Sequence, residues 1–135
     1  MFGNKHSKPQ NRIDSLIGAG TKVSGDVHFS GGLRVDGEIE GNVTANSSKP
    51  STLVLSENAR VDGAITVTHL VVNGVVTGPV YAADYLELQS KAKLTGDVHY
   101  KTLEIQLGAI IEGRLIHLAE GSEKVVALKI GGNES

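Results

Sequence analysis

A short pattern centred on glycine recurs along most of the chain, and it limits the folds that the chain can adopt. In Val61-Asp62-Gly63-Ala64-Ile65, aliphatic residues stand two positions before and two positions after the glycine. Alternation of apolar and polar residues is typical of short β-strands with one face turned to a core. The same pattern surrounds Gly25, Gly41, Gly63, Gly78, Gly96 and Gly113. All flanking positions are aliphatic, namely Val23, Ile39, Val61, Val76, Leu94 and Ile111 before the glycine and Val27, Val43, Ile65, Val80, Val98 and Leu115 after it.

A second short strand is predicted before each glycine pattern. Successive leading leucines, counted from Leu16, are separated by 17, 20, 17, 16 and 17 residues. The longest interval contains the polar insertion at residues 46–51, which we expect to form a surface loop. The strand segments are Leu33-Arg34-Val35, Leu53-Val54-Leu55, Leu70-Val71-Val72, Leu86-Glu87-Leu88 and Leu103-Glu104-Ile105, and Ser15-Leu16-Ile17 fits the same position loosely.

A repeat of this length is too short for a strand–helix unit, and it shows no helical period. It fits one coil of a parallel β-helix, in which three short strands turn alternate residues into a narrow core. We therefore predict an all-β fold, a three-sided parallel β-helix (solenoid) of about six coils, roughly 25–30 Å long at about 4.8 Å per coil. A β-sandwich or β-barrel is the alternative, but neither requires a register that is kept through every unit.

The chain divides into three predicted parts. Residues 1–14 form a flexible basic arm, in which Lys5, Lys8 and Arg12 precede the first acid. Residues 15–118 carry the β-helix. Residues 119–135 form a tail, whose apolar segment at 125–130 suits a cap on the last coil, an association contact or a loose end.

Composition argues against several classes of function. The chain has no cysteine, which excludes disulfides and cysteine-based metal or redox sites. Its net charge of −2 gives no general reason to expect a nucleic-acid partner. No apolar run reaches the length of a membrane-spanning helix, and the start lacks the apolar core of a secretory signal. We therefore expect a cytoplasmic location.

The residues that usually carry chemistry are scattered. His28 and His99 share one register but lie four coils apart, about 19 Å, which is too far for one metal ion. We therefore expect these two histidines, and likewise His6, His69 and His117, to lie at the solvated surface. The carboxylates beside the repeat glycines suit turns, and no phosphate-binding loop occurs. We predict no catalytic, cofactor-binding or metal-binding residue, and no enzyme.

The sequence leaves one enzymatic alternative open. His69 or His117 suits a lone base, as in left-handed β-helix acyltransferases. The six-residue repeat of those proteins is absent here.

The two ends of a solenoid pose a physical problem, because each exposes the cross-section of the core and the edges of the last strands. Coil-on-coil stacking of molecules solves it, and association at both ends produces a filament without nucleotide. A solenoid that binds a partner without polymerising is a further alternative. The candidate polymerisation residues are Leu16 and Ile17 at one end, and Ile110, Ile111, Leu115 and Leu118 at the other.

The repeat, its period and the basic arm resemble the bactofilins, bacterial polymer-forming cytoskeletal proteins. The resemblance implies a right-handed β-helix that polymerises end to end, without nucleotide, into non-polar filaments. It also implies binding of this homopolymer to the inner face of the cytoplasmic membrane, and scaffolding of cell-wall or cell-shape proteins. Many members begin with Met-Phe and a nearby lysine as a membrane-targeting signal, which Met1, Phe2 and Lys5 match and to which Lys8 adds charge. The terminal coil departs from the family, because it lacks the large aromatic residue often found there.

Overall fold

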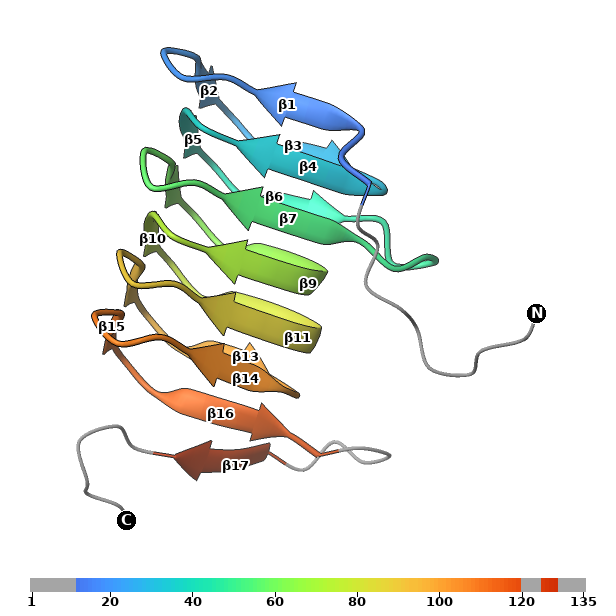
Figure 1. Ribbon diagram of the computed structural model, residues 1–135. Helices are drawn as coiled ribbons and strands as arrows, with labels where there is room; N and C mark the ends of the chain where they lie inside the picture. The colour runs from blue at the N-terminus through green and yellow to red at the C-terminus, as the bar shows by residue number, and fades with distance from the viewer. Residues whose placement is uncertain (1–11, 120–124, 129–135) are drawn as a thin grey trace.

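The computed structural model describes residues 12–119 and 125–128, and every regular element in these ranges is a β-strand. Three strands and three corners make one coil, and successive coils pair in parallel. Figure 1 shows the coils stacked in chain order, from β1 at one end to β16 at the other. The prediction of an all-β, three-sided solenoid is confirmed.

Each face of the solenoid is one ladder of parallel strands. The first face consists of β1 (Ser15–Ile17), β4 (Gly32–Val35), β7 (Thr52–Leu55), the second half of β9 (Ile65–Val72), the second half of β11 (Val80–Leu88) and β14 (Leu103–Ile105). The second face consists of β2 (Lys22–Ser24), β5 (Glu38–Glu40), β8 (Arg60–Asp62), β10 (Val75–Thr77), β12 (Lys93–Thr95) and β15 (Ile110–Glu112).

The third face ends differently from the other two. Its parallel strands are β3 (Val27–Phe29), β6 (Val43–Ala45), the first halves of β9 and β11, β13 (Val98–Tyr100) and β16 (Leu115–Leu118). A final strand, β17 (Val125–Leu128), pairs with β16 in the antiparallel direction. The solenoid therefore carries one strand that does not belong to its repeat.

Inward-pointing aliphatic residues fill the core, as the glycine pattern predicts. On the second face, the inner members Ile39, Val61, Val76 and Leu94 are fully buried, whereas the two end members are only partly buried. Burial of one such side chain contributes about 1.5–3 kcal/mol, so the stacked ladders stabilise the coils mutually.

Close stacking explains the repeat glycines at the corner between the second and third faces. A Cβ atom on Gly63 would overlap the carbonyl oxygen of Gly41 in the coil before it. Gly96 adopts a φ of +126°, which side-chain-bearing residues rarely tolerate. Only glycine fits both requirements.

Two local predictions are wrong at one residue each. Ser15, and not Leu16, pairs with Leu33, so Leu16 points outward and is 61% exposed. The predicted surface loop is confirmed at residues 46–50, which are exposed, but its last residue, Ser51, is 1% exposed. Its hydroxyl accepts a hydrogen bond from the Thr68 N–H at 3.1 Å, which explains why a polar residue is tolerated there.

Candidate functional site

The N-terminal end of the solenoid exposes its core on all three faces. The inward residues Ile17, Val23, Val27 and Phe29 of the first coil are only partly buried. In the part of the chain that the structure describes, β1, β2 and β3 each pair with a strand on one side only. A Cβ atom on Gly25 would meet no atom within 4 Å, unlike one on the equivalent inner glycines. This end therefore has both apolar surface and strand edges on which a further coil can stack.

Asp14 fixes the point at which the chain enters this end. Its N–H donates to the Gly32 carbonyl oxygen at 2.9 Å, and its carboxylate accepts from the Gly32 N–H at 3.0 Å. The second hydrogen bond, aided by the Arg12 side chain, lowers the pKa of the Asp14 carboxyl. Asp14 therefore lies at the N-terminal end, at the corner between the third and first faces.

The C-terminal end exposes apolar residues on its first and second faces. Leu103, Ala109 and Ile111 are partly buried at the end of the core. Three large residues of the same coil are exposed, and we call them the C-terminal apolar patch: Ile105 at 41%, Leu107 at 95% and Ile110 at 49%. In the described residues, β14 and β15 each pair with one strand only.

The third face is covered at this end. β17 runs along the edge of β16, with Leu128 opposite Leu115 and Ala127 opposite Ile116. Leu115 is 2% exposed, and Ile116, whose ladder neighbours point outward, is 6% exposed. The C-terminal end therefore offers two open faces.

The structure separates the candidate polymerisation residues into three groups. Leu16 and Ile17 lie at the N-terminal end, and Ile110 and Ile111 lie on the open second face of the C-terminal end. Leu115 and Leu118 belong to β16, which β17 covers. The predicted membrane-binding residues Met1, Phe2, Lys5 and Lys8 lie outside the described residues.

Sequence reasoning did not single out Ile105 or Leu107. A signal was present, because the corner before Ala109 matches the corners before Ala59 and Ala92. At the position of Leu107, those corners carry Glu57 and Ser90. A leucine in place of these polar residues exposes apolar surface at this corner, which is typical of an interaction site.

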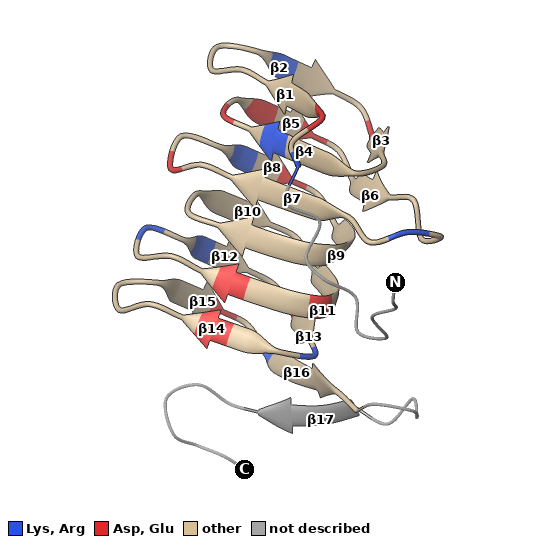
Figure 2. Cartoon of the chain, turned by 45° about the vertical axis from the view of Figure 1, so that its right-hand side comes forward, with Lys and Arg blue, Asp and Glu red and all other residues tan. Residues whose placement is uncertain are grey.

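The side faces differ in charge. Figure 2 shows basic residues on β2, β8 and β12 of the second face, and acidic residues on β5 between them. Lys22 on β2 forms an ion pair with Glu40 on β5 at 3.0 Å, which raises the pKa of the Lys22 ammonium. The outward ladder of the third face has no Lys, Arg, Asp or Glu, and consists of His28, Thr44, Thr66, Tyr81, His99 and Ile116.

Two polar contacts fasten the last coil to the one before it. The Tyr85 hydroxyl donates to Glu104 at 2.6 Å, and this hydrogen bond, helped by burial, raises the pKa of the tyrosine. Arg114 donates to the Asp97 carboxylate at 2.9 Å, which lowers the pKa of that carboxyl. The carboxylates of this region therefore hold coils together.

The sequence predicts that the histidines lie at the surface, and this prediction is wrong for His69. His69 is 4% exposed, and its Nδ1 lies 3.3 Å from the Ser51 carbonyl oxygen. His117 is partly buried, with Nε2 at 3.1 Å from the Lys101 carbonyl oxygen. These contacts fix the rings to the backbone of the preceding coil. No cluster of three or more His, Asp or Glu residues suits a metal ion within the described ranges.

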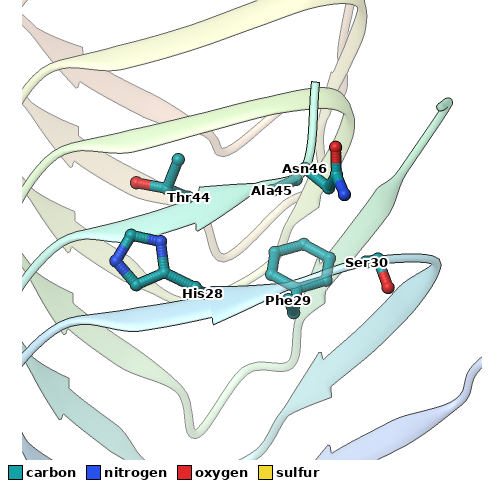
Figure 3. A pocket seen from close by; sticks show the side chains of 6 residues that line it. All are labelled: His28, Phe29, Ser30, Thr44, Ala45 and Asn46. Atoms are coloured by element: carbon teal, nitrogen blue, oxygen red, sulfur yellow. The ribbon is translucent and has the colours of Figure 1, made fainter. Parts of the chain in front are cut away.

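A hollow of about 420 Å³ lies on the third face, over the first two coils. Figure 3 shows His28, Phe29 and Ser30 beside Thr44, Ala45 and Asn46 of the next coil. No Lys, Arg, Asp or Glu lines this hollow. His28 is the one lining residue with ring nitrogens that can donate or accept a hydrogen bond. It is part of the N-terminal end.

The described residues also contain no helix that is long and apolar enough to cross a membrane.

Comparisons with known proteins agree with this geometry. A family model described as "Bactofilin: Polymer-forming cytoskeletal" matches residues 15–116. Bactofilin BacP of Myxococcus xanthus (strain DK1622) is 28% identical over 109 residues, which cover 81% of this chain and 44% of BacP. Bactofilin BacO of the same organism is 24% identical over 102 residues, which cover 76% of this chain and 78% of BacO. The chain thus spans less than half the length of BacP, and no solved structure matches it.

Proposed function

Because the chain belongs to the bactofilin family of polymer-forming cytoskeletal proteins, we propose that it assembles end to end into filaments without nucleotide. The observation that carries this proposal is the incomplete burial of the core at both ends. Inner members of the second-face ladder are fully buried, whereas Val23 and Ile111 at its two ends are only partly buried. Stacking of molecules buries both ends.

Strand edges supply direction to this contact. An edge strand presents unpaired N–H and C=O groups, which a strand of another molecule can pair. Apolar contact alone would permit many arrangements, but ladder pairing keeps the added coil in register. Association at both ends extends the assembly into a filament, since each added molecule exposes a new end.

The basic arm at residues 1–14 supports a second part of the proposal, which is binding to the inner face of the cytoplasmic membrane. Each basic residue near an anionic leaflet contributes about 1 kcal/mol, and Phe2 adds a modest burial contribution. One arm therefore binds weakly. A filament that presents many arms binds through avidity, and such a membrane-bound polymer suits the positioning of cell-wall or cell-shape proteins.

Electron microscopy of the purified full chain, negatively stained and free of nucleotide, tests the assembly. We expect filaments whose number grows with protein concentration. A species that remains strictly monomeric at high concentration would contradict the proposal.

Cosedimentation with liposomes tests the membrane contact separately. Phe2→Ala should release filaments from vesicles that contain anionic lipid, while the filaments themselves persist. Tyr81→Ala is the matched control for loss of an aromatic side chain outside the arm, because Tyr81 is exposed on a side face in the middle of the solenoid. Unchanged cosedimentation of the Phe2→Ala filaments would contradict a role of the arm in membrane binding.

A further inference from the structure

The inner ladder of the third face is buried unequally at its two ends. It begins at Val27 and ends at Leu115, and both residues belong to terminal coils. Val27 is partly buried, whereas Leu115 is 2% exposed. The other inward residues of the last coil, Leu103 and Ile111, are also only partly buried. The cover over Leu115 is therefore local to the third face.

β17 supplies this cover. All four of its residues pair with β16, and Leu128 and Val126 stand in register with the inward positions Leu115 and His117. The strand runs against the direction of the coils, so it does not continue the solenoid (Figure 1). It occupies the one free edge of β16, and an edge accepts a single strand.

We propose that β17 is a removable cap, which must leave the edge of β16 before a second copy of this chain can stack on all three faces of the C-terminal end. This inference rests on the proposed end-to-end assembly. A stacked coil needs the edges of β14, β15 and β16 together, and β17 blocks the last of them.

The cap is short enough to be displaced. Strand pairing of four residues at one edge is weak, since isolated pairs of strands are marginally stable in water. The capped form therefore competes with assembly without preventing it. If capped molecules outnumber open ones by about ten to one, removal of the cap lowers the concentration needed for assembly about tenfold.

Substitution of two adjacent residues of β17 by proline should release the cap in the full chain. In an antiparallel pair, alternate residues direct their N–H groups to the neighbour, so Val126→Pro with Ala127→Pro removes at least one group that faces β16. Sedimentation should then show assembly at about tenfold lower concentration than for the unsubstituted chain. The control carries Asn133→Pro with Glu134→Pro, which lie beyond β17, and should assemble as the unsubstituted chain does.

A disulfide tests the opposite state. Ile116 and Ala127 stand directly opposite each other, and Cα atoms in such pairs lie about 4.5–5.5 Å apart, within the range that a disulfide spans. The chain has no other cysteine, so Ile116→Cys with Ala127→Cys forms one internal bridge. The oxidised variant should assemble at least about tenfold less readily than the same variant after reduction, which serves as its own control.

The outcomes separate the cap from the assembly. Equal assembly of the oxidised and reduced variants, or weaker assembly of the proline variant, would overturn the cap while leaving end-to-end assembly intact. Failure of both the unsubstituted chain and the proline variant to assemble at any concentration would overturn both.

Discussion

The two ends of this solenoid are built from the same ladders, yet they present different surfaces. The N-terminal end leaves three inner ladders open, whereas at the C-terminal end β17 closes the third. The difference does not lie in residue type, because Val27 and Leu115 are both aliphatic and occupy one ladder. What decides exposure is whether a strand covers the edge of the last coil. In the capped form, an apolar residue in a terminal coil is therefore open to a second molecule only where that edge is free.

The largest expected effect comes from a charge placed at either end of one inner ladder. Val23→Asp and Ile111→Asp each put a carboxylate where a stacked coil would bury it, at a cost of about 3–5 kcal/mol for an unpaired charge. Both variants should fold, because both positions are partly exposed in the single molecule. Analytical ultracentrifugation should show assemblies that stop at a few molecules. Filaments of normal length in one variant would show that the corresponding end is not used.

Two leucines of the last coil sharpen the comparison of open and covered faces. Leu115→Ala should lower the free energy of unfolding by about 2–5 kcal/mol, as expected for a fully buried leucine. Leu103→Ala should lower it less, because Leu103 is only partly buried. Urea denaturation at concentrations below assembly measures both values. Equal losses would mean that β17 does not cover Leu115 in solution.

The C-terminal apolar patch predicts a smaller effect. Leu107 is 95% exposed, so Leu107→Ser should leave the stability of the single molecule unchanged. If assembly buries this side chain, its loss weakens the contact by about 1.5–3 kcal/mol, roughly 10–150-fold. Tyr81→Ser is the matched control, because Tyr81 is 43% exposed on a side face in the middle of the solenoid. Equal loss of assembly in both variants would place the contact on the sides.

The smallest expected effect concerns pH at the C-terminal end. The hydrogen bond from Arg114 lowers the pKa of Asp97, so the stability it gives to the last coil is present above the ordinary value of 3.8. That stability is lost as the pH falls through the lowered pKa. The protection of β16 against hydrogen exchange, measured relative to the intrinsic exchange rate at each pH, should therefore fall in acid, and Asp97→Asn should reduce this dependence. The same acid dependence in the variant would show that other groups control it.

The sequence predicts the body of the solenoid well, because each position of the repeat meets a packing requirement that recurs in every coil. The glycine must allow close stacking, and the flanking aliphatic residues must point inward, so both leave a periodic trace. The first coil breaks this rule: Ser15 replaces the leading leucine, and the neighbouring Leu16 misled the register. A terminal coil has fewer neighbours, so its residues are less constrained.

Features outside the repeat were harder to predict. The burial of His69 depends on the Ser51 carbonyl oxygen, which the chain brings near only after a full coil. Pairing of β17 with β16 follows an apolar segment that suited a cap, a contact or a loose end equally well in sequence. Leu107 was visible only by comparison with Glu57 and Ser90 at equivalent corners. Each depends on contacts between coils and not on the local pattern.

Hydrogen exchange of the assembled chain, compared with the single molecule, tests most directly whether the ends are the assembly surfaces. The account predicts that protection increases at β1, β2 and β3 and at β14 and β15, while β8 and β10 in the middle remain unchanged. Increased protection confined to the middle strands, with the terminal coils unchanged, would contradict it.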